Sequence, residues 1–299
     1  MSINGDNMPS QNNKISVRQA LIIFVISTLS PAIRLFPNIC SKYGQVAGWL
    51  APIISAPVML IVIFILYSFF KENKYTNLSD VLNACLGKAG GKALLAFYLF
   101  WITILNFLYI RYYASRLLGS IFPDTDIRFL ILVMMVLVSI SARGRIETLA
   151  RFSEFSFIMF TFVFIVFFLS LIPSVELENL LPITHYDLIP AAKASYPVLG
   201  VWSYVVFIFF FGENIADKDK IKEKGIRWFV YLAVLTTAMI FFVVGSLGWR
   251  VAQRMPLPFF NSTRLIEVIE SFDRFESVLL SVWVVADFII ISFYAKVLI

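Results

Sequence analysis

The chain has 299 residues, of which 60% are hydrophobic and only 15% are charged, and its mean hydropathy is +0.84. This composition excludes an ordinary soluble domain and predicts an integral membrane protein that crosses the bilayer several times. The formal charge of +6 is spread over short loops, so it indicates membrane topology and gives no reason to expect a nucleic-acid partner.

Eight apolar segments are long enough to cross the hydrocarbon layer of a bilayer. They follow a short polar tail at residues 1–14, which we expect to be disordered and cytoplasmic. The rest, 15–299, is predicted to be one all-α transmembrane domain with spans at about 18–39, 46–70, 93–118, 127–142, 153–172, 191–211, 227–249 and 277–299. The loops on the side of the N-terminus carry 14 Lys and Arg residues against 8 on the other side, which favours a cytoplasmic N-terminus.

Two short amphipathic helices are expected between the spans. The segment from Thr76 to Gly91 has apolar residues at helical spacing, begins at Asn77 or Ser79 as a cap, and ends on glycine. It should lie in the membrane interface. Residues 262–272 show a similar pattern and should form an outer helix over the mouth of the bundle.

The first span carries Ser30, Pro31, Ala32 and Arg34 near its centre. Proline removes a helix hydrogen bond and clashes with the preceding turn, so this pattern predicts a broken helix. The outer half-helix, beginning at about Ala32, would then present free N–H groups and a positive dipole end to an anion. The alternative is a proline kink without function.

The sixth span is predicted to be interrupted as well, because Pro197 and Gly200 precede Trp202 and Ser203. By itself this signal is weak, since Gly200 also suits close helix packing. Two broken spans at corresponding positions are typical of transporters built from five helices followed by five inverted helices. The pattern therefore predicts a binding site between the first and sixth spans.

The third span places Asn106, Tyr109 and Tyr113 on one helical face. Polar groups on one face of a membrane helix point into the bundle, where they contact a ligand or hold helices together. We leave both roles open.

Asp287 lies near the middle of the eighth span, where an unpaired carboxylate costs several kcal/mol. Three roles are compatible with this position: a structural partner of Arg34 or Arg111, a proton-carrying acid, or a contact for a cationic amine. Trp283, one turn earlier on the same face, would form a wall of the cavity.

At the start of the fifth span, Glu147, Arg151 and Glu154 are spaced so that they can form ion pairs along one helical face. We interpret them as a structural ladder, with a cytoplasmic gate latch as the alternative. 

The sequence offers no nucleophile elbow, phosphate loop, zinc motif or paired catalytic carboxylates, so we do not expect an enzyme. Cys40 and Cys85 fall on opposite sides of the predicted membrane, and His185 is the only histidine. We therefore expect neither a disulfide nor a metal or other cofactor.

Several stretches in this order resemble the spore germination permeases, the B subunits of endospore germinant receptors in the amino acid-polyamine-organocation superfamily. They are spread over most of the chain: Leu29-Ser-Pro-Ala-Ile-Arg-Leu-Phe-Pro37 followed by Gly44-Gln45 and Trp49; Gly144 with Glu147-Thr-Leu-Ala-Arg151 and Glu154; Asn179-Leu-Leu-Pro182; and Arg274-Phe-Glu276 leading to Trp283.

The resemblance implies a LeuT-like bundle of ten helices in a five-plus-five inverted repeat, with broken first and sixth helices around the ligand. This chain departs from that pattern in two ways. It ends at Ile299 within an apolar run, which leaves about eight helices without the last two, and it has Ser30-Pro31 where the family often has glycine.

The resemblance also implies a small-molecule nutrient germinant, such as an amino acid, and a place in the spore inner membrane beside the A and C subunits of a receptor. We expect Ser30 and the backbone beyond it to receive a carboxylate, and Arg34 and Asp287 to set the polarity of the site. The side-chain pocket would be shaped by Asn106, Tyr109, Trp202, Ser203 and Trp283. A proton-coupled amino acid transporter, with Asp287 carrying the proton, is the alternative.

Overall fold

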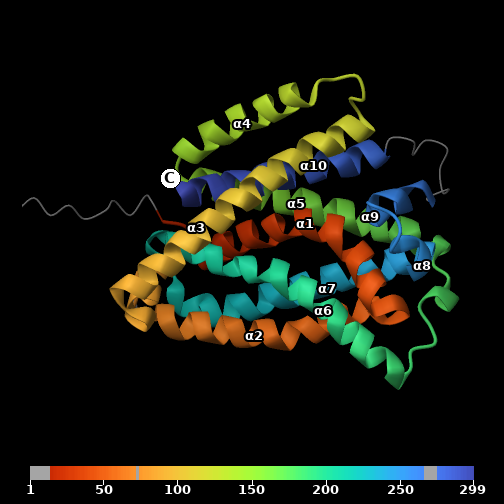
Figure 1. The fold of residues 1–299 in the computed structure, drawn as a ribbon, viewed down its shortest axis with the longest axis horizontal. Helices are drawn as coiled ribbons and strands as arrows, with labels where there is room; N and C mark the ends of the chain where they lie inside the picture. Colours follow the sequence, from red (N-terminus) through yellow and green to blue (C-terminus); the bar gives the residue numbers. More distant parts are fainter. Residues whose placement is uncertain (1–13, 72–73, 266–274) are drawn as a thin grey trace, which may run out of the picture.

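The computed structural model describes residues 14–71, 74–265 and 275–299, and in these ranges it consists of helices and connecting loops without β-strands. Figure 1 shows the long helices running along the length of an elongated bundle. The expected all-α class is therefore confirmed. The α-helices are α1 (Val17–Gly44), α2 (Ala51–Phe70), α3 (Leu78–Ser120), α4 (Ile127–Arg143), α5 (Ile146–Leu171), α6 (Leu188–Trp202), α7 (Ile221–Leu247), α8 (Trp249–Ala252), α9 (Pro258–Asn261) and α10 (Phe275–Leu298).

Shorter 3-10 helices lie between them or continue them. They are η2 (Gln45–Leu50), η4 (Ile172–Ser174), η5 (Leu177–Asn179), η6 (His185–Asp187), η7 (Ser203–Asn214), η8 (Lys218–Lys220) and η9 (Ser262–Leu265).

Six helical stretches in the described part of the chain are long and apolar enough to cross a membrane, which makes this a multi-pass membrane protein. The first stretch, Val17–Phe70, is 54 residues long and contains both α1 and α2. α4, with only 17 residues, is not among the six. The other five stretches are Leu78–Ser120, Ile146–Ser174, His185–Asn214, Lys218–Leu247 and Glu276–Leu298.

α1 is the central helix of the bundle, and 20 of its 28 residues are buried. Ser16 caps its start and forms a capping box with Gln19, and the helix packs against α5, α6, α7 and α10. The predicted break at Ser30 to Arg34 is wrong, because α1 runs as one α-helix through both Pro31 and Pro37. Burial on every side holds the helix together where the local sequence alone would interrupt it.

The sixth span does not unwind; it changes from an α-helix to a 3-10 helix. α6 contains Pro197 and runs to Trp202, and from Ser203 the chain continues as the 3-10 helix η7. The predicted interruption is therefore a change of hydrogen-bond pattern, located a few residues after Pro197. Such 3-10 stretches within a longer helix often mark a functional hinge.

α3 is a helix with a sharp bend at its start. Asn77 and Asp80 form a capping box, and the first nine residues form a short helix that ends at Gly87. The backbone there has φ 72°, a left-handed conformation that suits glycine. After the bend the chain passes close to the short helix at Gly91, where only glycine fits, because a Cβ would lie 2.3 Å from Asn83 Oδ1. The short helix predicted between Thr76 and Gly91 is thus confirmed.

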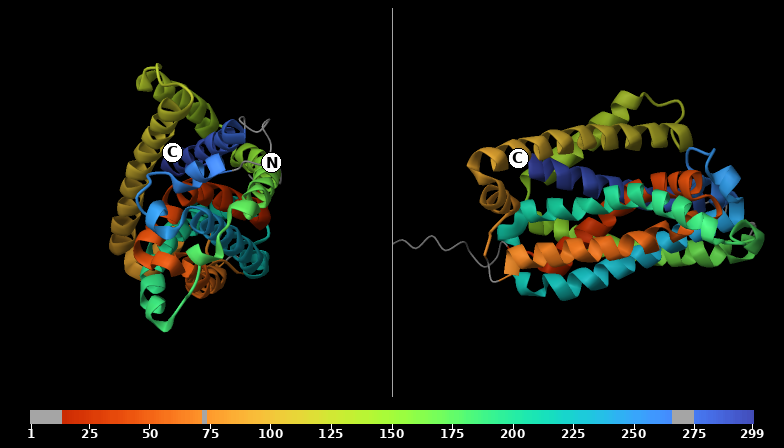
Figure 2. Two further views of the ribbon diagram at one scale, coloured as in Figure 1. Left: turned by 90° about the vertical axis from the view of Figure 1, so that its right-hand side faces the viewer. Right: turned by 60° about the horizontal axis from the view of Figure 1, so that its bottom comes forward.

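α4 lies at the edge of the bundle, beside α3 and α10 (Figures 1 and 2). Only four of its residues are buried, and they form one stripe at a spacing of four: Leu130, Met134, Val138 and Ala142. The opposite face is apolar and exposed, as expected for a helix that faces lipid.

Two predicted features lie largely outside the described residues. The polar tail falls on residues 1–13, and most of the outer helix predicted at 262–272 falls on residues 266–272. Cys40 is buried, Cys85 is exposed, and both are free.

Candidate functional site

A cluster of four side chains from three helices lies in the middle of the bundle, and we call it the central cluster: Ser30, Arg116, Trp283 and Asp287. Asp287 accepts hydrogen bonds from the Ser30 hydroxyl and from the Arg116 guanidinium, with which it forms an ion pair. Trp283 Nε1 donates to Ser30 Oγ at 3.2 Å. The guanidinium of Arg116 lies over the indole ring of Trp283, 3.8 Å from its centroid.

The central cluster is almost completely withdrawn from solvent. Asp287 is 2% exposed, Ser30 3% and Trp283 1%, while Arg116 is 9% exposed. A buried charge is tolerated only when it is paired and hydrogen-bonded, which Asp287 achieves through Ser30 and Arg116. Arg116 Nε is also buried but has no partner among the described residues, so one strong donor remains unused.

Helical periodicity explains how the cluster forms. Trp283 and Asp287 are four residues apart on α10, and Tyr109, Tyr113 and Arg116 follow one face of α3. All five side chains are buried. The ion pair joins α3 to α10 over 171 positions of sequence, so neither helix alone can satisfy its charge.

Three tyrosines gather next to the central cluster. The hydroxyl oxygens of Tyr109 on α3 and Tyr204 on η7 lie 3.4 Å apart. The ring of Tyr294 on α10 lies 6.0 Å from each of the other two rings. Its hydroxyl is buried and has no hydrogen-bond partner among the described residues. The interior thus contains a second polar group beside the ion pair, the Tyr294 hydroxyl.

The pairing of Asp287 differs from the predicted one. Arg34 lies against the ring of Tyr112, 3.2 Å from its centroid, and makes no hydrogen bond or ion pair with Asp287. Arg111 is exposed. The partner is Arg116, which lies one turn beyond Tyr113 on the face that the tyrosine spacing had already marked.

Other predicted site residues lie away from the central cluster. Pro31 and Ala32 are buried inside the continuous α1, so the half-helix end expected at Ala32 is not formed. Asn106 lines a hollow between α3, α4 and α10. Trp202 is buried but packs edge-on against Phe229 of α7.

Gly200 and Ser203 are exposed. A Cβ at Gly200 would meet nothing within 4 Å, and the Ser203 hydroxyl donates to the Gly200 carbonyl. Of the predicted ligand-binding residues, Ser30, Trp283 and Asp287 are brought into direct contact, and Tyr109 lies beside them.

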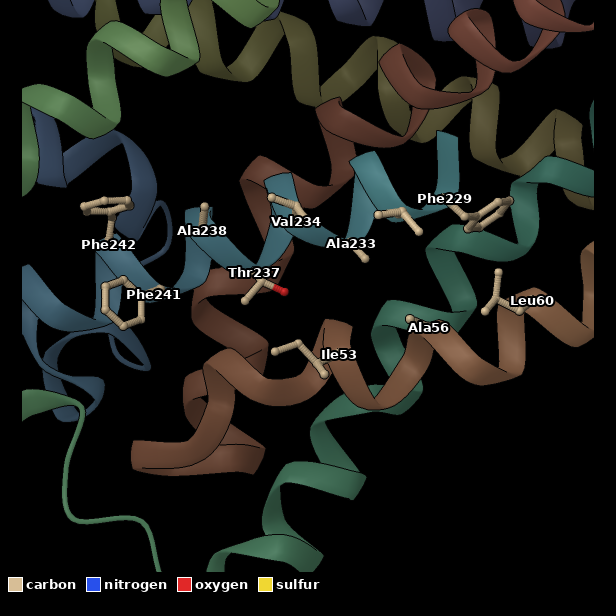
Figure 3. Close-up of a pocket in the computed structure, with 11 residues that line it drawn as sticks. Ile53, Ala56, Leu60, Phe229, Ala233, Val234, Thr237, Ala238, Phe241 and Phe242 are labelled. Atoms are coloured by element: carbon tan, nitrogen blue, oxygen red, sulfur yellow. The ribbon is translucent and has the colours of Figure 1, made fainter. Parts of the chain in front are cut away.

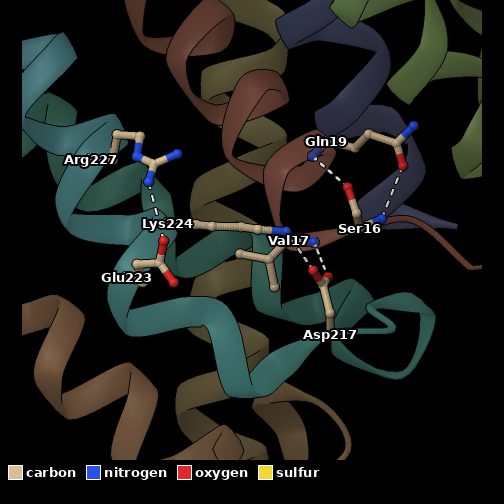
Figure 4. Close-up of polar contacts among 7 residues, drawn as sticks. All are labelled: Ser16, Val17, Gln19, Asp217, Glu223, Lys224 and Arg227. Atoms are coloured by element: carbon tan, nitrogen blue, oxygen red, sulfur yellow. Dashed lines mark hydrogen bonds and ion pairs between the residues drawn. The ribbon is translucent and has the colours of Figure 1, made fainter.

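A second set of contacts ties the start of the chain to the connection between η7 and α7, and we call it the clamp. Ile15 pairs with Ile215 as an isolated parallel β-bridge, with Ile15 N–H donating to Asn214 O at 2.8 Å. Asp217 accepts from Val17 N–H at 2.6 Å and pairs with Lys224 at 2.5 Å. Figure 4 shows Asp217 between Val17 and Lys224.

The charge on Asp217 is favoured by its surroundings. Partial burial raises its pKa, but the hydrogen bond from Lys224 and the Val17 N–H lower it by more, so the net shift of the pKa is downward. The clamp therefore depends on an ionised carboxylate. 

One member of the predicted ladder on α5 makes a contact with α1. Glu154 accepts from the Gln19 amide at 3.0 Å, which links α5 to α1. The described part of the chain contains no ion pair among Glu147, Arg151 and Glu154. One carboxylate oxygen of Glu147 is buried without a partner, and Arg151 is exposed.

No group of three or more His, Cys, Asp or Glu residues that could hold a metal ion occurs within residues 14–71, 74–265 and 275–299. 

Comparison with known proteins gives two matches. Residues 14–299 match the family model described as "Spore germination protein". The chain is also similar to Spore germination protein KB of Bacillus subtilis (strain 168), with 21% identity over 296 residues. The alignment covers 94% of this chain and 76% of that protein.

Proposed function

Because this chain belongs to the spore germination permease family, we propose that it is the permease-like subunit of a spore germinant receptor, without enzymatic activity. In this proposal it binds a small nutrient germinant, such as an amino acid, and so helps to trigger germination. It would act in the spore inner membrane beside A and C subunits, with its N-terminus in the cytoplasm. The proposed architecture is the LeuT-like repeat, with about eight spans in this chain.

The central cluster is the observation that carries this proposal. It combines a carboxylate, a guanidinium and a hydroxyl at the middle of α1 and α10, next to unpartnered polar groups. An intramembrane charged group is expensive, so its presence at this depth points to a functional site.

The chemistry of the ion pair fits a zwitterion. A free amino acid carries one carboxylate and one ammonium group, so it can enter between Arg116 and Asp287 and replace one ion pair by two. The ligand carboxylate would accept hydrogen bonds from the Arg116 guanidinium, including the unused Nε, and the ligand ammonium would pair with Asp287. Charge would stay paired throughout, which avoids the cost of exposing either buried group.

Binding of such a ligand would change the arrangement of the helices. Once it occupies the cluster, α3 and α10 are joined through the ligand and no longer directly. Binding then shifts the protein toward the arrangement that holds the ligand better, by the difference in affinity between the two arrangements. That shift is the signal we expect the receptor partners to read.

The test is ligand-dependent thermal stabilisation of the purified protein in lipid nanodiscs, with a panel of amino acids. A ligand at about 100 times its dissociation constant should stabilise the wild type by about 2.7 kcal/mol. Arg116→Gln should lose this stabilisation, whereas Arg111→Gln, an exposed arginine of the same helix, should keep it. A swapped pair, Arg116→Asp with Asp287→Arg, keeps the ion pair and should still lose binding. Unchanged affinity in both cluster variants would rule out the site.

The alternative function is proton-coupled amino acid transport, and a buried carboxylate at mid-span is the feature that favours it. Vesicles that contain only this chain would then accumulate amino acid in response to a pH gradient, and Asp287→Asn would abolish the accumulation. Binding without accumulation supports the receptor role. Spores that carry Arg116→Gln should in that case fail to germinate with the nutrient while Arg111→Gln spores respond normally.

A further inference from the structure

A groove opens toward the membrane between α4, α5 and α10, with a volume of about 480 Å³. Its walls are apolar and include Leu137, Ile140, Phe152 and Phe288. Phe152 and Phe288 are packed edge to face, 5.7 Å between centroids, and so join the α5 and α10 walls of the groove. We call this the α4–α5 groove.

A second hollow of about 260 Å³ runs along the neighbouring face of α4 and ends at Arg143. Ile140 lines both hollows and is 67% exposed, so it forms a ridge between them. Arg143 lies one helical turn beyond Ile140. Two hollows thus lie on either side of Ile140, and one of them is lined by a cation.

Two hydroxyl side chains line the end of the α4–α5 groove that lies at the connection between the two helices, and we call this end the mouth. Ser141 lines it from α4 and Thr148 from α5. Gly144 lies between them in the connection from α4 to α5. Lys296 donates to the carbonyls of Ala142 and Gly144, at 3.4 and 2.6 Å, and so holds this connection in place.

Exposed arginines lie on both sides of Gly144 in the chain, and Arg143 lines the adjoining hollow. Arg143, Arg145 and Arg151 are exposed, and none of them forms an ion pair with a described carboxylate. The nearest acid in sequence is Glu147, and one of its carboxylate oxygens is buried. Two adjoining apolar hollows, with two hydroxyls in one lining and an exposed arginine in the other, are the chemistry that an acidic lipid complements.

The groove between α2 and α7 provides the contrast (Figure 3). It has the same volume, about 480 Å³, and its lining is apolar apart from Thr237. Neither groove has a lysine or arginine in its own lining, but the α4–α5 groove shares Ile140 with the hollow that Arg143 lines. Lipid chains can occupy the α2–α7 groove, but it has no cation with which to select a headgroup.

We propose that the α4–α5 groove and the adjoining hollow bind one anionic phospholipid of the leaflet at the Gly144 end of the bundle. Its two acyl chains lie on either side of Ile140, and its phosphate contacts Arg143 and Arg145. Ser141 and Thr148 donate to oxygens of the headgroup. The lipid thereby covers the exposed face of α4 and joins it to α5.

The experiment measures binding of phosphatidylglycerol and phosphatidylcholine to delipidated protein in neutral detergent, by native mass spectrometry. Wild type should retain one phosphatidylglycerol and exclude phosphatidylcholine from that site. Arg143→Gln with Arg145→Gln should weaken phosphatidylglycerol binding about 25-fold, since each cation near a headgroup contributes about fivefold. Arg227→Gln, an exposed arginine at the start of α7, is the matched charge control and should change nothing.

A second pair of variants tests the groove itself while the charges stay. Ser141→Trp should fill the mouth and abolish binding, and Thr148→Trp does the same from the other wall if the first variant does not fold. Val234→Trp in the α2–α7 groove is the control and should have no effect. Equal retention of both lipids by wild type, normal binding in the filled variants, or displacement by inorganic phosphate would each overturn the proposal.

Discussion

The central cluster and the clamp both hold distant parts of the chain together with a carboxylate and a cation, but they do so in different surroundings. The side chains of Arg116 and Asp287 are 6% and 3% exposed, whereas those of Lys224 and Asp217 are 23% and 21% exposed. In the cluster every contact is made by side chains; in the clamp the main chain takes part. We therefore propose that the cluster responds to a ligand that matches its charges, and we expect the clamp to respond to pH and salt.

The largest effect should come from breaking the buried pair. Asp287→Asn leaves the Arg116 charge buried without its counter-ion, and we expect this to destabilise the protein by about 3–5 kcal/mol. Thermal unfolding in a mild detergent measures it. The exposed pair of Arg227 and Glu223 is the control, and Glu223→Gln should cost less than about 0.5 kcal/mol.

Replacing both members of the pair tests whether the unpaired charge causes this loss of stability. Arg116→Met with Asp287→Leu removes both charges together and should recover most of the lost stability. If the double replacement were as unstable as Asp287→Asn alone, the loss would come from packing around α10 and the ion pair would not be its cause.

The clamp should show an intermediate effect that depends on pH. Asp217→Asn removes a charge-assisted hydrogen bond and an ion pair, and we expect a cost of about 2 kcal/mol at pH 7. The pKa of Asp217 is lower in the folded protein than its ordinary value near 4, so its contribution is present above that value. It is lost as pH falls through the lowered pKa, so wild type and variant should converge in acid.

Asp219, an exposed acid of the same connection, supplies the control for this titration. Asp219→Asn should leave the pH dependence of the melting temperature as it is in wild type. A difference between wild type and Asp217→Asn that stayed constant from pH 7 to below pH 4 would contradict the role of the charge.

The smallest effect should come from the contact between α1 and α5. Glu154→Ala removes one hydrogen bond to Gln19 and should cost about 1 kcal/mol. Gln19→Ala should cost more, because Gln19 also accepts from Ser16 N–H in the capping box. Thermal unfolding of both variants provides the comparison, and Arg151→Ala should be neutral. A clear loss of stability in Arg151→Ala would contradict this and support the predicted ion pairs with Glu147 and Glu154.

Much of the helical layout could be predicted, because long apolar runs and local capping signals act over short distances. A cap at Asn77 or Ser79, apolar residues at helical spacing and a closing glycine predicted the short helix that forms the start of α3. The meeting of Ser30, Trp283 and Asp287 could be anticipated because polar side chains in membrane helices turn inward.

The rest depended on contacts that no local pattern contains. Packing on all sides keeps α1 helical through Pro31, which overrides the preference of the residue. The reach of Arg116 from near the end of α3 to the middle of α10 depends on how the two helices cross. The clamp relies on main-chain bonds between short apolar segments at Ile15 and Ile215, and such bonds have no side-chain signature.

The bridge between Ile15 and Ile215 also has a consequence for biosynthesis. The two residues are 200 positions apart, so the contact is unavailable until the ribosome has made most of the chain. At the usual rate of about 5–20 residues per second, the start of α1 waits about 10–40 s for its partner. α1 must therefore enter the membrane with its first turn unattached, and the closing of this end is a late event in the assembly of the bundle.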